Sequence, residues 1–407
     1  MGIFSKFAKR EKRDAGSQRA DSLIAAHFFQ GLVGSVSQAG IQVTPQKAMG
    51  VATVYACVNV LSRTISTLPL HVYRRSGDKN EKAYDQRVYD LLHNAPNSEM
   101  TSADFRAAVQ GDLSLRNNGY AQIVRDRTGR IIELIPVRTE HMHVYRNLAG
   151  ELRYRYSNGS QTIGLGANEV IHLKGHTRDG LLGEDLVRMC NDVIGLAIAL
   201  DVNASKYFAN GSRPGNIYEH PGVLTDKAFD RLKEDLKKKS GPGNEFQDMI
   251  LEDGLKMAKA RSENRDSQFD ESRNRQSLAI CSLFGVPPHK VGIVSNQPRA
   301  NVEQENISFA VDTIRPLCVV WEQVLNQRLF TAEERRIYYA EFDISGLVRG
   351  DLKTRYEAYA QARQWGWLSV NEIRKKENMN PIGVGGDTYM QPLNMTGLGQ
   401  QEEANNA

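Results

Sequence analysis

Hydrophobic positions recur at three- and four-residue steps over most of the chain, which predicts a largely helical protein with one strand-rich stretch. The spacing predicts a helix over 48–68 and another over 101–115, the second with Thr101 or Ser102 as its N-cap. The apolar stripe of the first helix is expected to comprise Val51, Val54, Tyr55, Val58, Leu61 and Ile65. Over 119–173 the pattern changes to short segments separated by Gly, Asn or Asp, namely AQIVRD, IIELIPV, HMHVYR, LRYRY and EVIHLK. The fold class that this order predicts is α+β, with a mostly antiparallel sheet.

Two long helices follow, over 184–210 and 264–284, and they flank a small inserted unit. The first helix is apolar over a wider arc than one core face needs, since further apolar residues lie beside its main stripe: Ile194, Leu196, Ile198 and Val202. We therefore expect this helix to have neighbours on both sides. The insertion reads as a strand, GNIYEH, a helix that begins at Leu224-Thr225, and a hairpin, MILEDGLKMAKA, and the helix is expected to bury Phe229, Leu232 and Leu236.

Pro287 and Pro288 are followed by a loop without regular pattern over 292–301 and then by a helix over 302–329. Pro316 lies inside that helix, where a missing amide and a ring clash predict a kink near 312–315. A strand, RIYYAEFD, and two helices, over 351–364 and 370–377, complete the prediction.

Composition removes several classes of protein. The chain has 407 residues, and 52 basic minus 48 acidic residues leave a net charge of +4, which is too small for a general nucleic-acid coat. Its 40% hydrophobic content is enough for real cores, and the chain lacks any apolar run of about 18 residues that would predict a membrane span. The N-terminus has no apolar core of a secretory signal. Four cysteines, widely spaced in sequence, predict reduced, buried thiols in a cytoplasmic protein: Cys57, Cys190, Cys281 and Cys318.

Residues 1–45 are expected to form a flexible basic arm, because basic residues outnumber acidic ones and Gly, Ser and Gln follow them. A specific contact of this arm with nucleic acid or a partner is the alternative.

The candidate catalytic and metal sites are weak. The chain contains neither a G-x-x-x-x-G-K-[ST] phosphate loop nor a G-x-S-x-G elbow. His172 and His176 have a spacing that would suit a helix, but Gly175 and the strand-like EVIHLK argue against one. His141 and His143 would share one strand face without a nearby carboxylate pair or cysteine, and Asp226 with Asp235 falls on an amphipathic helix. We therefore predict no catalytic residue, no metal site and no cofactor.

One charge feature stands out between Ser272 and Val302, a stretch without any Asp or Glu that contains Arg273, Arg275, Lys290 and Arg299. Chance can produce such a stretch in a chain that is one-quarter charged. The functional interpretation is a segment kept free of acids because it faces a polyanion.

A colinear series of motifs over about 45–395 resembles the portal proteins of tailed bacteriophages, of the HK97-like (siphovirus) type. The series opens with TVYACVNVLSRTISTLPL at 53–70. It continues with Leu91-Leu92 and Pro96-Asn97, NGYA at 118–121, EVIH at 169–172, DGL at 179–181, FANG at 208–211, FGVPP at 284–288, EFD at 341–343, RGD at 349–351 and NEIR at 371–374.

The resemblance implies a portal subunit with the following parts: arm 1–45, α+β wing 46–183, stem helix 184–211, clip 212–260, stem helix 261–286, channel loop and kinked helix 287–330, wing strand 331–350, and helical crown with C-terminal tail 351–407. It implies a ring, usually dodecameric, at one capsid vertex of the virion, which conducts double-stranded DNA without reading its sequence and docks terminase and the head–tail connector. The resemblance also implies contact with the major capsid protein or a scaffold, and no contact with a membrane.

The residues that this mapping places on the DNA channel are Lys290, Ser295, Asn296, Gln297 and Arg299, with Pro316 as the helix kink. Those placed on the docking surface of the clip are Asp230, Lys233, Glu234, Lys237, Lys238 and Lys239. The lining is sparse in positive charge, which suits a conduit, because every neutralised phosphate strengthens binding and would slow passage. The alternatives are a metal-dependent nuclease that processes phage DNA, with Asp235 at its centre, and a neck or connector protein that forms no channel.

Overall fold

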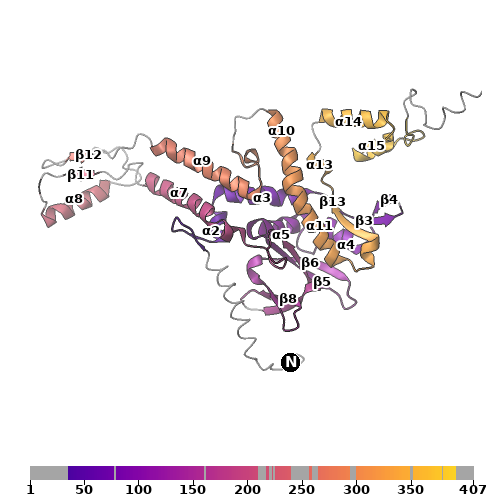
Figure 1. Ribbon diagram of the computed structural model, residues 1–407, viewed down its shortest axis with the longest axis horizontal. Helices are drawn as coiled ribbons and strands as arrows, with labels where there is room; N and C mark the ends of the chain where they lie inside the picture. Colours follow the sequence, from indigo (N-terminus) through magenta and orange to yellow (C-terminus); the bar gives the residue numbers. More distant parts are fainter. Residues whose placement is uncertain are drawn as a thin grey trace, which may run out of the picture. The chain divides into compact units, whose positions relative to one another are not determined.

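The computed structural model describes residues 35–77, 79–159, 162–209, 217–219, 222, 225–239, 256–258, 265–293, 299–348, 352–377 and 379–390 (Figure 1). The chain forms two compact units. The first comprises Met1–Gln297 and Val311–Asp343, and the second comprises Pro298–Ala310 and Ile344–Ala407.

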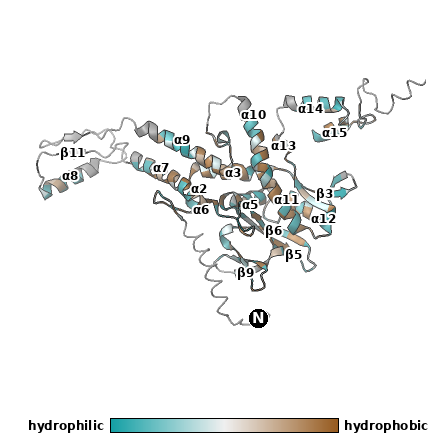
Figure 2. Cartoon of the chain, in the orientation of Figure 1, coloured by the Kyte–Doolittle hydropathy of each residue, from teal (hydrophilic) through white to brown (hydrophobic). Residues whose placement is uncertain are grey.

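Two packed helices, α3 (Ala52–Thr67) and α5 (Ser102–Arg116), lie at the centre of the first unit. Helix α5 begins with a capping box between Thr101 and Asp104, as the sequence predicts for its N-terminus. Hydrophobic residues dominate α3, whereas the N-terminal part of α9 (Arg265–Phe284) is hydrophilic (Figure 2). The predicted apolar stripe of α3 needs one correction, because Tyr55 is 55% exposed and Cys57 takes a buried position instead.

Three three-stranded sheets surround these helices, and every described pairing within them is antiparallel. Their strand orders are β10 (Val170–Lys174), β5 (Asn118–Arg125), β6 (Ile131–Val137); β13 (Tyr338–Phe342), β3 (Leu70–Ser76), β4 (Lys79–Lys82); and β7 (Met142–Arg146), β8 (Leu152–Ser157), β9 (Thr162–Gly166). The α+β class is confirmed. The single sheet expected over 119–173 is two sheets, and β4 and β9 escape prediction because KNEK has no apolar residue and TIGLG carries two glycines.

Helix α11 (Arg315–Leu329) packs against strands β10 and β13. Its Trp321 is fully buried, and the indole Nε1 donates a 2.8 Å hydrogen bond to Oε1 of Gln110 on α5. The remaining short elements of this unit are α2 (Pro45–Met49), α4 (Arg87–His93), α12 (Glu334–Ile337) and the 3-10 turns η1 (Thr139–His141), η2 (Ala167–Glu169) and η3 (Pro288–Val291).

The predicted helix over 184–210 consists of α6 (Leu186–Met189) and α7 (Asn191–Ala209), which are separated at Cys190. Helix α9 runs beside α7 and is joined to it by an ion pair of 3.1 Å between Arg273 and Asp201. The Gln276 side chain also donates a hydrogen bond to the carbonyl of Val193.

Between α7 and α9 the chain forms β11 (Ile217–Glu219), α8 (Asp226–Lys239) and β12 (Lys256–Ala258). Strand β12 pairs with β11, with Tyr218 opposite Met257. The first arm of the expected hairpin lies outside the described residues. The prediction that Phe229 is buried is also wrong, because its side chain is 56% exposed. A two-stranded sheet offers too little apolar surface to cover the whole hydrophobic face of a helix.

The boundary of the N-terminal arm differs from the sequence prediction. Strands β1 (Ser35–Val36) and β2 (Gln42–Val43) form a hairpin that is attached to α7. The amide of Gln38 donates a 2.7 Å hydrogen bond to Asp192, and Asn191 donates one of 3.2 Å to the carbonyl of Val36. The arm is therefore ordered from residue 35 onwards, and the prediction for 1–34 lies outside the described residues.

The second unit contains α10 (Arg299–Ser308), α13 (Ser345–Val348), α14 (Leu352–Gln364) and α15 (Val370–Lys376). Ser369 caps α15 in a capping box with Glu372. Glu377 joins the last two helices, because it accepts from Arg355 at 3.0 Å and from the Tyr359 hydroxyl at 2.9 Å. None of the described helices in either unit is long and apolar enough to span a bilayer.

Candidate nucleic-acid interface

The turn that leads from α9 towards the predicted channel loop is closely specified by its sequence. Gly285 adopts a left-handed φ of 62°, and the amide of Val286 donates to the carbonyl of Cys281 at 3.0 Å, which ends α9 in a Schellman-type cap. Pro287 is extended, and Pro288 begins the 3-10 turn η3. Gly292, with a φ of 81°, closes that turn, so two glycines and two prolines determine the path of 285–292.

Thr313 fixes this turn to the start of α11. Its hydroxyl donates a 2.8 Å hydrogen bond to the carbonyl of Gly285. A Cβ at position 285 would lie 3.1 Å from the same hydroxyl oxygen. Glycine is therefore required here both by the backbone conformation and by the close approach of Thr313.

Lys290 lies in η3 and is exposed, and desolvation lowers the pKa of its amine. Arg299 is the first residue of α10, and its side chain is outside the described residues. Ser295, Asn296 and Gln297 also lie outside them. Their role as a DNA-channel lining stays a prediction.

The acid-free stretch between Ser272 and Val302 is less cationic than its sequence indicates. Arg273 is neutralised by Asp201 of α7 at 3.1 Å, and Arg275 pairs with Glu271 at 2.6 Å. The functional interpretation of this stretch therefore rests on Lys290 and Arg299.

The segment just before Pro316 departs from α-helical geometry. Phe309–Ile314 (η4) is a π-helix between α10 and α11, and the boundary between the two units falls inside it. Pro316 is the second residue of α11, which follows η4 without a break because Ile314 keeps a right-handed helical backbone, and the proline supplies no amide to this helical run. The sequence predicts the kink at this place, and the bend itself stays a prediction.

The residues predicted for docking all lie on α8. Asp230, Lys233 and Glu234 are exposed on it, as a contact surface requires. Lys237, Lys238 and Lys239 form the last turn of α8, and their side chains lie outside the described residues.

A buried polar hub around Asn118 was missed by sequence reasoning, although it lies in the NGYA motif. The Asn118 Oδ1 atom accepts from the Gly183 amide at 2.8 Å and from His172 Nε2 at 3.0 Å. Its Nδ2 donates to the carbonyls of Gly183 at 2.7 Å and Arg116 at 3.0 Å. Next to it, Asn117 has a left-handed φ of 55° and donates to the carbonyl of Glu184 at 2.7 Å. The hub thus positions the start of α6 against β5.

His172 belongs to this hub and not to a metal site. Tyr154 contacts its Nδ1 at 3.2 Å while Asn118 engages its Nε2, so both ring nitrogens are occupied. Burial, with the charges of Lys174 and Arg328, lowers the pKa of His172 to about 3, and the imidazole is neutral at pH 7. His176 is 66% exposed and faces Glu184 at 3.8 Å.

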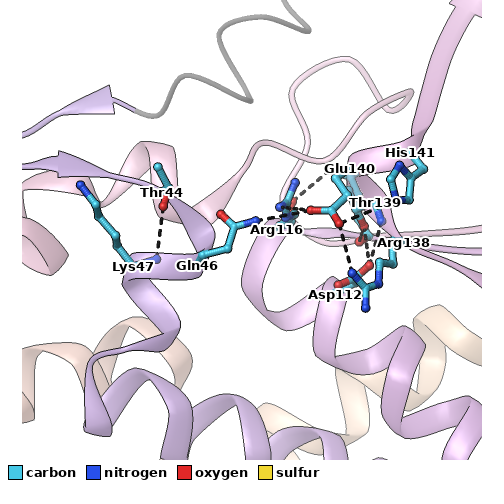
Figure 3. Close-up of polar contacts among 10 residues, drawn as sticks. Thr44, Gln46, Lys47, Asp112, Arg116, Arg138, Thr139, Glu140 and His141 are labelled. Atoms are coloured by element: carbon cyan, nitrogen blue, oxygen red, sulfur yellow. Dashed lines mark hydrogen bonds and ion pairs between the residues drawn. The ribbon is translucent and has the colours of Figure 1, made fainter. Parts of the chain in front are cut away.

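A second polar cluster joins α2, α5 and η1 (Figure 3). Glu140 lies 3.4 Å from both Arg116 and Arg138, and it accepts a 3.5 Å hydrogen bond from Gln46. Asp112 accepts from the amide of Thr139 at 2.8 Å, and burial raises the pKa of its carboxyl. These groups satisfy one another, which is typical of a structural cluster.

Among the described residues, no group of three or more His, Cys, Asp or Glu side chains could hold a metal ion. Asp226 lies in the first turn of α8, and the side chain of Asp235 is outside the described residues. The described part of the chain therefore lends no support to the nuclease alternative.

The family model described as "Phage portal protein" matches residues 52–378, which is most of the chain. The chain belongs to the phage portal protein family. The function of that family is to form the conduit for DNA packaging at a capsid vertex, and portal proteins are structural components of the virion.

Two curated portal proteins are similar along most of their length. The portal protein of Enterobacteria phage HK97 is 29% identical over 89% of this chain and 87% of its own. The probable portal protein of Streptomyces phage phiC31 is 30% identical over 91% of this chain and 84% of its own.

Solved structures agree on the portal fold. A chain from the neck of an empty gene transfer agent (GTA) particle has a TM-score of 0.60 at 23% identity, with 81% of this chain and 90% of that chain covered. The crystal structure of an HK97 family phage portal protein from Corynebacterium diphtheriae has a TM-score of 0.56 at 18% identity, with coverage of 75% and 98%.

Proposed function

We propose that twelve copies of this portal subunit assemble into a ring at one vertex of the capsid. The ring is the conduit through which double-stranded DNA enters during packaging and leaves during ejection. Family membership supports this proposal, and the exposed apolar residues of α7 are the observation of this chain that carries it. The assembly takes place in the host cytoplasm, before the genome is packaged.

Helix α7 has apolar side chains on two flanks as well as on its core face. Ile194 is fully buried, which corrects its place outside the core stripe, whereas Leu196 is 45% and Val202 39% exposed. Leu196 and Val202 are six positions apart, which at about 100° per residue places them about 120° apart around the helix. They lie on opposite sides of the stripe that contains Ile194. A subunit inside a ring meets one neighbour on each side, head to tail, so both flanks would be covered.

The proposed channel lining comprises Lys290, Ser295, Asn296, Gln297 and Arg299. Twelvefold symmetry turns one cationic side chain per subunit into a collar around the duplex. Two cationic residues per subunit, Lys290 and Arg299, attract phosphates, and the polar uncharged residues between them add no base-specific grip.

The proposed docking surface is α8 with its exposed residues Asp230, Lys233 and Glu234, and with Lys237, Lys238 and Lys239 at its end. Terminase would bind there during packaging, and the head–tail connector would replace it. Phe229, which is 56% exposed, adds an apolar anchor to this surface. Major capsid protein or scaffold would contact the outside of the ring.

The ring has no enzymatic activity in this proposal. The sequence has no phosphate loop, so the energy for translocation comes from a separate ATP-driven motor.

The test of the channel is the double variant Lys290→Ala/Arg299→Ala in a packaging assay that measures nuclease-protected DNA in the capsid. We expect normal rings and a several-fold loss of protected DNA, because the collar that guides the phosphates is gone. Arg146→Ala, which removes an exposed arginine from the hairpin of β7 and β8, is the matched control and should package normally. Undiminished packaging by the double variant, or failure of its rings to assemble, would refute the assignment of both residues to the lining.

A further inference from the structure

Helices α3 and α9 contact each other through two successive pairs of side chains. The Thr53 hydroxyl donates a 3.3 Å hydrogen bond to the hydroxyl of Ser277. Four residues further along both helices, the thiols of Cys57 and Cys281 are hydrogen-bonded to each other. Because residues four apart share one face of a helix, the two pairs are consecutive contacts between the same faces of α3 and α9.

The two thiols are enclosed by the core. Cys57 is 0% and Cys281 is 1% exposed, and both are free cysteines. Their hydrogen bond raises the pKa of Cys57 and lowers that of Cys281, so Cys281 is the thiol that deprotonates first. The sequence gives no sign of this pair, because the two cysteines belong to separate helices that only the fold brings together.

We propose that Cys57 and Cys281 form a reversible disulfide in the folded protein when a small two-electron oxidant is present. This proposal does not depend on the channel or on the docking surface. The disulfide would covalently join α3 to α9 immediately before the Gly285–Pro288 turn. Portal proteins are virion components, and disulfides persist in the oxidising surroundings of a released particle.

The chemistry balances with diamide, a diazene, as the oxidant. The Cys281 thiolate adds to the N=N bond and a proton reaches the other nitrogen. The Cys57 sulfur then attacks the Cys281 sulfur as its own proton passes to the nitrogen that leaves, the S–S bond forms, and the S–N bond breaks. The leaving nitrogen takes the second proton, so the two thiols lose two hydrogens and two electrons and the diazene becomes a hydrazine.

The other two cysteines are not suited to this reaction. Cys190 lies at the break between α6 and α7, where desolvation raises the pKa of its thiol. Cys318 is buried on α11, and burial raises the pKa of its thiol to about 12. Both lie outside the contact between α3 and α9, so neither is placed to exchange with this pair.

The experiment treats the full-length folded protein with diamide, blocks the remaining thiols under denaturing conditions, and measures intact mass and peptides. We expect the number of free thiols to fall from four to two, and a peptide pair that links Cys57 to Cys281, reversed by dithiothreitol. The variants Cys57→Ser and Cys281→Ser should each keep three free thiols, whereas Cys190→Ser should still lose two. Because the linked peptide is sought in the unaltered chain, the result does not depend on how the variants fold.

Four free thiols after oxidation of the folded chain would overturn the proposal, as would a linkage that contains Cys190 or Cys318 or that joins two chains. The oxidised protein should also melt several degrees above the reduced one, because the bond closes a long loop in the unfolded chain. A lower melting temperature after oxidation would refute the stabilising role. These results concern thiols alone, so they stand apart from any failure of ring assembly or packaging.

Discussion

At Asn118 one carboxamide connects three segments of the first unit. Strand β5 supplies the residue, β10 supplies His172, and the segment before α6 supplies Gly183. All four hydrogen bonds of the side chain are made, and Asn118 is only 4% exposed. Aspartate or alanine at this position would leave buried donors or acceptors without partners.

Asn118→Ala should lower the free energy of unfolding by about 2–4 kcal/mol, because it strands the amide of Gly183 and the Nε2 proton of His172 inside the core. Chemical denaturation measures the loss. Asn147→Ala is the matched control, since Asn147 also binds through its side chain but in the exposed turn before Glu151. We expect the control to lose less than about 1 kcal/mol; equal losses in both variants would contradict the role of the hub.

His172 makes stability depend on pH. Its pKa is about 3 in the folded chain against an ordinary value of 6.5, so the unfolded chain binds more protons between these values and stability falls as pH falls below 6.5. The contribution is complete above pH 6.5 and is lost progressively towards pH 3. By pH ~4.5 the stability lost through His172 should amount to about 3 kcal/mol.

The measurement is the free energy of unfolding from pH 7 to pH 4 for the wild type and for His172→Gln. The variant should be less stable at pH 7 but should lose less between pH 7 and pH 4, by about 3 kcal/mol. Burial lowers the pKa of His71 and raises that of Asp112, and these contributions are common to both proteins and cancel in the difference. Parallel pH profiles would show that His172 does not titrate with unfolding.

The burial and contacts of single residues could be predicted from the sequence only in part. Periodicity places Val54, Val58, Leu61 and Ile65 in the core correctly, because each is decided by its own helix. It misplaces Tyr55, Ile194 and Phe229, because their burial depends on whether another element covers that side of the helix. The partners of Asn118 lie more than fifty residues away in sequence, so only the assembled fold reveals them.

At the scale of elements, the path from α9 to α11 depends on a short turn between two interrupted helices. Gly285 needs a left-handed backbone and lies against Thr313, whereas Gly292 needs a left-handed backbone only. A comparison of substitutions at the two glycines therefore separates the cost of backbone strain from the cost of steric contact.

Gly285→Ala should cost about 2–3 kcal/mol in the free energy of unfolding, and Gly292→Ala about 1–2 kcal/mol. Both variants place a Cβ on a left-handed residue, but only at position 285 does it meet Thr313 Oγ1, at 3.1 Å. Thermal or urea unfolding of the two variants side by side measures the difference. A Gly292→Ala variant at least as unstable as Gly285→Ala would contradict the contact argument.

Helices α5 and α9 were predicted almost to their boundaries, because a capping residue begins α5 and a glycine followed by prolines ends α9. The break at Cys190 and the π-helical Phe309–Ile314 were not, because neither interrupts the hydrophobic period. Pro316 does indicate the irregular segment before it, because proline lacks the amide that a helix interior needs. The missing amide does not reveal, however, that α10 belongs to the other unit.

At the scale of the whole molecule, the two exposed flanks of α7 indicate how subunits meet. Leu196→Asp/Val202→Asp should give a folded subunit that forms no ring, because each charge would be buried against a neighbour without a partner. Native mass spectrometry and far-ultraviolet circular dichroism measure assembly and folding. The conservative pair Leu196→Met/Val202→Ile should assemble normally, and intact rings from the charged variant would place the interface elsewhere.

The sequence motifs were specific enough for the family but not for the site. FGVPP, NGYA and EVIH each specify a turn or a buried contact of the portal fold, and a colinear series of such motifs identifies that fold. The motifs do not identify a channel lining, because such a lining is defined by symmetry-related copies rather than by contacts within one chain.

The measurement that tests the central claim most directly is imaging of the purified full-length protein together with its native mass. The account predicts closed rings with a central hole that admits duplex DNA, at about twelve times the 45.5 kDa of one chain. A monomer or dimer, or a ring whose centre is too narrow for the duplex, would contradict it.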